Sequence, residues 1–114
     1  MLRQTEAGLS PEWWAALPKA MHQGDVRHLS ELSPAQAIDA LQKLCHDLVL
    51  RQTRSAPRFF ELAQLPASRA SVLTLTDWFK RLMQSARTAE HPFNAGLMLE
   101  ALTADAQQTL HAQG

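Results

Sequence analysis

The sequence is poor in the residues that mark disulfides, strands and membrane spans. Cys45 is its one cysteine, so a disulfide within the chain is excluded. It has no tyrosine and four glycines, and no apolar run approaches the roughly 20 residues that a membrane-spanning helix needs. The N-terminus also lacks the apolar core of a signal peptide. We therefore expect a soluble protein of the cytoplasm with no membrane contact.

An excess of charge is lacking as well. Lys+Arg and Asp+Glu number 11 each, so the formal net charge is zero. A protein whose main task is to bind nucleic acid usually has a basic excess, because neutralising phosphates supplies most of its affinity. The charge totals give such a task no support. The 114 residues, 46% of them hydrophobic, are enough for one compact folded domain and not for two.

Helix-forming residues and start signals are what the sequence does contain. Abundant Ala, Leu and Gln predict an all-α protein, which we expect to be a small orthogonal bundle of about five helices. Ser10-Pro11 and Ser33-Pro34 each join an N-cap to a proline at the first helical position. Gly24 should end the first helix, Asp25 should cap a short second one, and Pro18 predicts a kink or break. Residues 1–9 carry no periodicity, and we expect a disordered lead-in or the remnant of a longer chain before a single helical domain at 10–114.

Apolar spacing predicts the buried faces of the longer helices. In each, apolar positions recur at intervals of three and four residues, which places them on one side of a helix. A second long helix is expected from about Ser68 or Ser71 to Ala89. The expected stripes are Ile38, Leu41, Cys45, Leu48 and Gln52, widened by Leu44 and Val49; Val72, Leu75, Phe79, Leu82 and Ala86; and Leu99, Leu102, Ala106 and Leu110.

Two positions outside these stripes have predicted local roles. Asp47 and Arg51, four residues apart, should form an ion pair on the outer face of their helix. Between the last two helices stands "EHPFNAGLMLEAL". Pro92 disfavours helical backbone at His91 and should end one helix, and Asn94 should cap the next.

Motifs for catalysis are missing from the sequence. The isolated glycines cannot form a phosphate-binding loop, and no spacing matches a zinc site. Cys45 and His46 are adjacent on a helix, where their side chains point about 100° apart, so a thiol–imidazole pair is not expected. Cys45 also lies on an apolar stripe and should be a core residue. We predict no catalytic, cofactor or metal site, and scattered surface positions for His22, His28, His46, His91 and His111.

The remaining candidates are surface residues. Arg51, Arg54 and Arg58 form the one basic cluster, which either contacts phosphate or is simply solvated near a helix C-terminus. Trp13 and Trp14 are adjacent, so one of them should be partly exposed unless a kinked helix buries both. The adjacent residues Phe59 and Phe60 are expected in the core.

Two segments resemble a known family. "ALQKLCHDLVLRQTRSAPRFF" and "FKRLMQSARTAEHPFNAGLMLEALTADAQQTL" are similar to the C-terminal domain of the delta-prime subunit of bacterial DNA polymerase III. That family has a helix with an Asp-Leu-Leu-type centre, an aromatic loop, and a last helix opening with His-Pro-Leu-Asn. The resemblance spans residues 12–112, and the last helix departs from it by turning polar at "TADAQQT". The matching residues are Asp47, His91, Pro92, Asn94, Leu99, Glu100 and Leu102.

The resemblance implies a function in DNA replication. Delta-prime belongs to the clamp loader, a five-membered ring that places the sliding clamp on primed DNA, and its C-terminal domain helps form the collar that holds the ring together. The expected partners are the delta and tau/gamma subunits, with DNA reached only through the complete loader. The parent holoenzyme is a DNA-directed DNA polymerase, a nucleotidyltransferase, whereas this collar-like domain would be non-catalytic and located in the bacterial cytoplasm.

Other functions stay open at this point. A stand-alone module could bind nucleic acid through Arg51, Arg54 and Arg58, and salt-dependent DNA binding would favour it. A small hydrolase or metalloprotein has no sequence feature in its favour. For the collar function, the candidate interface residues are apolar positions off the core stripes: Trp14, Trp78, Phe93 and Met98. Each of them could instead be buried in the core of the domain itself.

Overall fold

All regular secondary structure in the described part of the chain is helical. The computed structural model describes residues 9–66, 68–89 and 94–112. Within them lie four α-helices, α1 (Pro11–His22), α2 (Pro34–Gln52), α3 (Val72–Ala86) and α4 (Ala95–Leu110). Two short 3₁₀ helices, η2 (Val26–Leu29) and η3 (Leu62–Gln64), interrupt the connections. The all-α prediction is confirmed, and the expectation of about five helices is slightly off because two short segments form single 3₁₀ turns.

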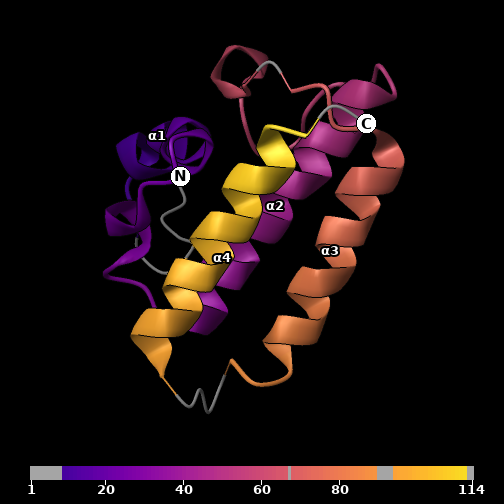
Figure 1. The fold of residues 1–114 in the computed structure, drawn as a ribbon. Coiled ribbons are helices and arrows are strands. Elements are labelled where there is room, and N and C mark those ends of the chain that lie inside the picture. The colour runs from indigo at the N-terminus through magenta and orange to yellow at the C-terminus, as the bar shows by residue number, and fades with distance from the viewer. Residues whose placement is uncertain (1–8, 67, 90–93, 113–114) are drawn as a thin grey trace.

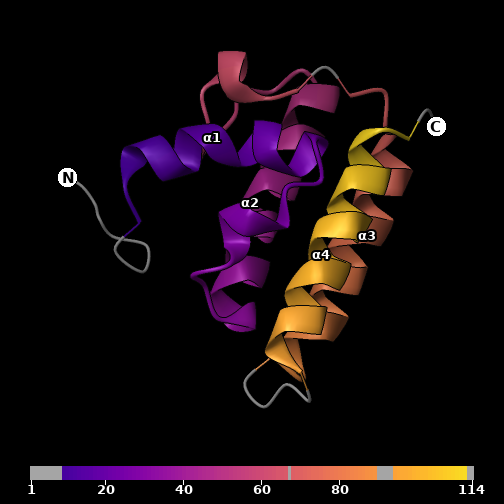
Figure 2. The same cartoon turned by 60° about the vertical axis from the view of Figure 1, so that its left-hand side comes forward.

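The three longer helices lie alongside one another, and α1 crosses them. Figure 1 shows α2 and α4 running in one direction and α3 in the other. Figure 2 shows α1 running across the end of α2 where the chain leaves it. The helix α4 contacts α1, α2 and α3, so it covers one side of the α2–α3 pair. None of the described helices combines the length and hydrophobicity needed to cross a bilayer.

The predicted helix starts are confirmed. Ser10 Oγ accepts from the backbone N–H of Trp13, and Asn94 Oδ1 accepts from that of Leu97. At the start of α2, Ser33 and Gln36 form a reciprocal capping box. Asp25 caps η2, which is a 3₁₀ turn. These side chains satisfy N–H groups that the first turn of a helix leaves without backbone partners.

The first helix passes through Pro18 without a break. It is one segment from Pro11 to His22, followed by Gly24 with a positive φ of 71°. Pro18 is itself buried, as are Leu17 and Met21 beside it. Packing against the rest of the core therefore outweighs the single hydrogen bond that the proline removes.

A core of mainly leucine and alanine side chains lies between the helices. The predicted stripes of α2 and α4 are buried, apart from Val49, which is half-buried, and Gln52, whose amide donates to the Ala70 carbonyl at 2.7 Å. On α3 the buried face is Leu75, Trp78 and Leu82, whereas Val72 and Ala86 are exposed. That face is rotated from the predicted stripe because α3 packs against both α2 and α4.

An ion pair joins α3 to α4 at the surface. The Arg81 guanidinium donates from Nε and Nη2 to the two carboxylate oxygens of Asp105, at 3.0 and 2.9 Å. This bidentate bond raises the pKa of Arg81 above its usual range. The two helices are antiparallel neighbours, and the pair fixes their relative register.

Candidate protein-interaction surface

Asp47 holds the connection between α2 and η3. Its carboxylate is completely buried and accepts three successive backbone N–H groups, those of Arg58 at 2.9 Å and of Phe59 and Phe60 at 2.7 Å each. His46 Nδ1 lies 3.3 Å from the same carboxylate. Consecutive N–H groups converging on one anion form a compact anion-binding arrangement. Asp47 therefore fixes the path of a loop that has no regular structure of its own.

The predicted outward ion pair between Asp47 and Arg51 is wrong. Asp47 faces the loop, and Arg51 donates from Nη1 to the Leu65 carbonyl at 3.3 Å. Both side chains thus bind backbone groups of the 53–71 connection. An exposed ion pair at this spacing stabilises a helix by only about 0.2–0.5 kcal/mol. A buried N–H without a partner costs about 1–3 kcal/mol. Accepting the loop N–H groups therefore stabilises the fold more than an exposed ion pair would, and Asp47 faces the loop.

The loop fixed by Asp47 presents one phenylalanine inward and one outward. Phe60 is buried, and the prediction that Phe59 is also in the core is wrong, since 45% of it is exposed. Residues 58–60 form a bend around the Asp47 carboxylate, which turns Phe60 toward the core and leaves Phe59 at the surface. Phe59 is therefore held at the surface by a buried carboxylate next to it.

Cationic and aromatic side chains surround Phe59. Lys43 Nζ and the Arg58 guanidinium each lie 5.8 Å from the centre of its ring, and the His46 ring meets it edge-on at 5.5 Å. Lys43 Nζ is also 5.8 Å from the ring of Trp14, which in turn contacts Phe60. We call this group the Phe59 surface: Trp14, Lys43, His46, Arg58 and Phe59.

The Phe59 surface combines residue types that are frequent at protein interfaces. Aromatic rings bury a large area on association, and tryptophan and arginine are frequent among residues that dominate binding energy. Cations over the ring faces hold the side chains in place before a partner arrives. The arrangement favours non-covalent contact with another macromolecule. Sequence reasoning missed Lys43 and His46 because they join the surface only through the loop that Asp47 folds back.

The motifs behind the delta-prime resemblance have local roles in this fold. Asp47 organises the aromatic loop, Asn94 caps α4, and Leu99 and Leu102 are buried while Glu100 is exposed. His91 and Pro92 lie outside the described residues. Comparisons with known protein families, curated proteins and solved structures find no match for this chain. The collar function stays a prediction.

The four predicted interface residues have different locations. Trp14 belongs to the Phe59 surface, and Met98 is half-buried against the core on α4. Trp78 is completely buried in the core of its own domain, so it offers nothing to a partner while the domain is folded. Phe93 lies outside the described residues. Of the four, Trp14 is the one placed within a cluster of other binding-type side chains.

The three arginines of the basic cluster do not share one environment. Arg51 is half-buried with its guanidinium on a carbonyl, and Arg58 lies against Phe59. Arg54 is exposed and adopts a positive φ of 65° in the turn that follows α2. Arg58 alone joins the Phe59 surface, so the predicted phosphate contact reduces to one arginine with Lys43 beside it.

The histidines bind backbone and neighbouring rings. Trp13 Nε1 donates to the His28 carbonyl at 2.9 Å, His28 Nε2 donates to the Trp13 carbonyl at 3.0 Å, and the two rings stack. The His22 and His111 rings lie 4.1 Å apart. Within the described residues, no three His, Cys, Asp or Glu side chains gather as a metal site would require.

Cys45 occupies an environment that suppresses thiol chemistry. Its Sγ donates to the Leu75 carbonyl at 3.1 Å, and the residue is completely buried. Burial raises the pKa of the thiol to about 12. The thiolate is the nucleophilic form of cysteine, so at neutral pH this side chain behaves as a small core residue.

Proposed function

We propose that this chain is a non-catalytic protein-interaction domain, and specifically the C-terminal collar domain of a DNA polymerase III delta-prime subunit. The observation that supports it best is the Phe59 surface, which Asp47 builds from the loop that carries part of the resemblance. The same loop would then serve both the fold and the contact. The domain needs no cofactor or metal in this role.

The proposed contact is with neighbouring subunits of a clamp loader in the bacterial cytoplasm. The delta and tau/gamma subunits are the expected partners, and sliding-clamp loading in DNA replication is the expected process. Burying Phe59 and Trp14 against a partner would supply apolar free energy, and Arg58 would favour carboxylates at the edge of the contact, whereas Lys43 is already paired with Asp39. DNA would be reached only through the assembled loader.

Co-purification with the delta and tau/gamma subunits tests this proposal. The chain is mixed with both subunits, and complex formation is scored by size exclusion at moderate salt. Phe59→Ala should weaken the complex by about tenfold or more, because truncating an anchoring aromatic side chain typically costs at least about 1.4 kcal/mol of binding free energy. Leu97→Ala is the matched control, since Leu97 is 60% exposed at the start of α4. No complex with the wild-type chain, or equal loss in both variants, would contradict the proposal.

A second candidate function is binding to single-stranded nucleic acid. It is favoured by the half-exposed ring of Phe59 with Lys43 and Arg58 beside it, since bases stack on aromatic rings and cations bind phosphates. The zero net charge counts against it. Fluorescence anisotropy with a labelled oligonucleotide at several salt concentrations separates the two functions. Salt-dependent binding that Arg58→Ala weakens, without subunit binding, would favour this candidate.

A further inference from the structure

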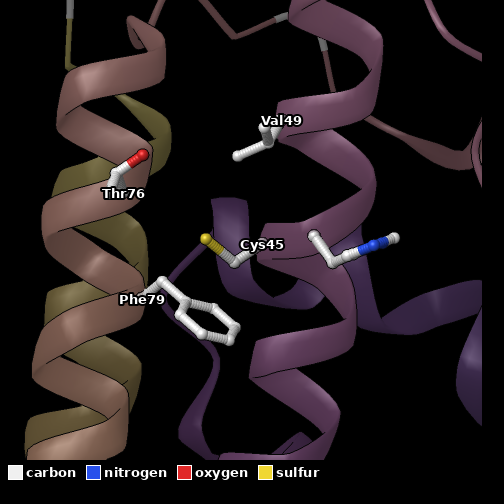
Figure 3. Close-up of a pocket in the computed structure, with 5 residues that line it drawn as sticks. Cys45, Val49, Thr76 and Phe79 are labelled. Carbon is white, nitrogen blue, oxygen red and sulfur yellow. The ribbon is translucent and has the colours of Figure 1, made fainter.

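A second surface lies between α2 and α3, and His46 belongs both to it and to the Phe59 surface. A hollow of about 220 Å³ is lined by Cys45, His46 and Val49 of α2 and by Thr76 and Phe79 of α3. Figure 3 shows Cys45, Val49, Thr76 and Phe79 converging on the space between the two helices, with α4 behind α3. The lining is almost wholly apolar.

The apolar lining continues along α3 beyond the hollow. Val72, Thr76, Phe79 and Met83 recur at i, i+4, i+7 and i+11, which places them on one side of the helix. Val72 is 40% and Met83 is 47% exposed. This stripe is separate from the buried stripe of Leu75, Trp78 and Leu82. We call the hollow with Val72 and Met83 the α2–α3 groove.

Cationic side chains follow the α3 edge of the groove. Lys80 and Arg87 are seven residues apart. With Thr76 and Met83 they stand at i, i+4, i+7 and i+11, which places all four on one side of α3 and the turn that follows it. Both are exposed, and neither has an ion-pair partner in the part of the chain that the structure describes. Asp77 is the one carboxylate within α3, three residues before Lys80. The α2 edge carries His46 and no carboxylate within the lining.

We propose that the α2–α3 groove binds an amphipathic helix of a partner protein, whose apolar stripe is flanked on one side by Asp or Glu. Its apolar side chains would fill the hollow over Cys45 and Phe79, and its carboxylates would pair with Lys80 and Arg87. Laying an amphipathic helix into an apolar groove is a recurrent mode of recognition. This inference goes beyond the collar function and does not depend on it, because the two surfaces share His46 alone and the groove is built mainly from other residues of α2 and α3.

The charges favour a different protein over a second copy of this chain. In a symmetric dimer the same patch would meet itself. The groove would then bring Lys80 and Arg87 of both copies to one interface, with Asp77 as the only carboxylate of α3 to oppose them. A partner helix with an apolar stripe and an acidic edge matches all three features of the groove: an apolar floor, apolar ends, and two cations on one rim.

Two synthetic helical peptides test the groove directly. Both are about 18 residues long, or five turns, with leucines at i, i+4, i+7 and i+11; one has glutamates beside the leucines and the other has lysines. The Glu peptide should bind the full chain about tenfold or more tighter than the Lys peptide in fluorescence anisotropy at low salt. In amide chemical-shift maps, its binding should shift signals of α2 and α3 around Cys45, Thr76 and Phe79.

Variants of the groove give the decisive comparison. Lys80→Glu with Arg87→Glu should reverse the preference between the peptides, and Met83→Asp should weaken both. All three positions are exposed, so the variants should keep the wild-type melting temperature, and Leu97→Asp on α4 is the matched control. No binding of the Glu peptide, equal binding of both peptides, or equal loss in Leu97→Asp overturns the proposal. A dimer in sedimentation that Met83→Asp abolishes overturns it in favour of a second copy.

Discussion

The carboxylate of Asp47 and the backbone N–H of Phe60 lie 2.7 Å apart across 13 residues of chain. Two further N–H groups of the same loop bind this carboxylate. One carboxylate that accepts from three successive N–H groups, the last of them buried, can order a loop that lacks regular hydrogen bonding, because a buried N–H otherwise lacks a partner. The contact links the fold of α2 to the position of Phe59 on the surface.

Replacing Asp47 by asparagine should destabilise the domain. Asparagine keeps one acceptor oxygen, but its amide nitrogen can only donate and would face a backbone N–H. At least one buried donor would lose its partner, so the free energy of unfolding in urea should fall by about 1–3 kcal/mol. Asp39→Asn is the control, since Asp39 forms an exposed pair with Lys43 and should cost under about 1 kcal/mol. Equal losses of unfolding free energy in the two variants would show that the contacts of Asp47 with the loop stabilise the domain no more than an exposed ion pair does.

The indole N–H of Trp78 is buried and has no hydrogen-bond partner among the described residues, which gives a different kind of prediction. Trp78→Phe removes this unsatisfied donor along with part of the ring, so the two effects on stability partly cancel. Trp78→Ala leaves a cavity and should cost about 3–5 kcal/mol. The loss for phenylalanine should be well under half of that, measured by urea unfolding. Similar losses for both variants would mean that the indole N–H has a partner in solution.

The parts of this fold that depend on neighbours in sequence could be predicted. Ser10, Asp25, Ser33 and Asn94 act as caps as expected, because a cap involves residues only two or three positions apart. The buried stripe of α4 could also be read from its spacing. The end of α3 was placed at Ala89 and lies at Ala86, within the usual uncertainty of helix ends.

The parts that depend on distant contacts could not be predicted. Asp47 has the sequence signature of a solvent-exposed ion pair, and only the return of residues 58–60 to α2 explains its burial. Trp78 lies off the apolar stripe that the sequence predicts for α3, and only the packing of α3 against both α2 and α4 explains its burial. The same limit applies to the Phe59 surface, whose members come from α1, α2 and the loop. Tertiary packing, not local pattern, selects which apolar and charged residues face outward.

Leu102→Ala should destabilise the domain by about 2–5 kcal/mol, the usual cost of truncating a buried leucine. Leu102 lies on the buried face of α4 and is 5% exposed. Leu97, on the same helix, is 60% exposed, so Leu97→Ala should change the free energy of unfolding by about 0.5 kcal/mol or less. A loss near zero for Leu102→Ala would mean that α4 presents another face to the core.

Cys45 should make stability fall at high pH. Burial raises the pKa of its thiol from 9.0 to about 12, so between these values the folded chain keeps a proton that the unfolded chain releases. The unfolded state then binds fewer protons, and stability declines as pH rises through this window, by about 1.4 kcal/mol per pH unit at most. Urea unfolding from pH 8 to 11 should show a steeper decline for the wild type than for Cys45→Ala. Parallel curves would contradict a buried thiol.

Replacing Arg54 by glycine should stabilise the domain. It follows α2 with a φ of 65°, a left-handed conformation that disfavours side chains with a Cβ. In this turn the N–H of Ser55 reaches back to the Leu50 carbonyl at 2.7 Å, a closing pattern in which glycine is the preferred residue. Arg54→Gly should therefore raise the free energy of unfolding by up to about 1 kcal/mol, in urea unfolding. The control is Ala101→Gly at an exposed position within α4, which should lower it by about 1 kcal/mol. If Arg54→Gly also lowers it, the guanidinium has a contact worth more than the strain, and the phosphate-binding candidate should be tested again with this arginine included.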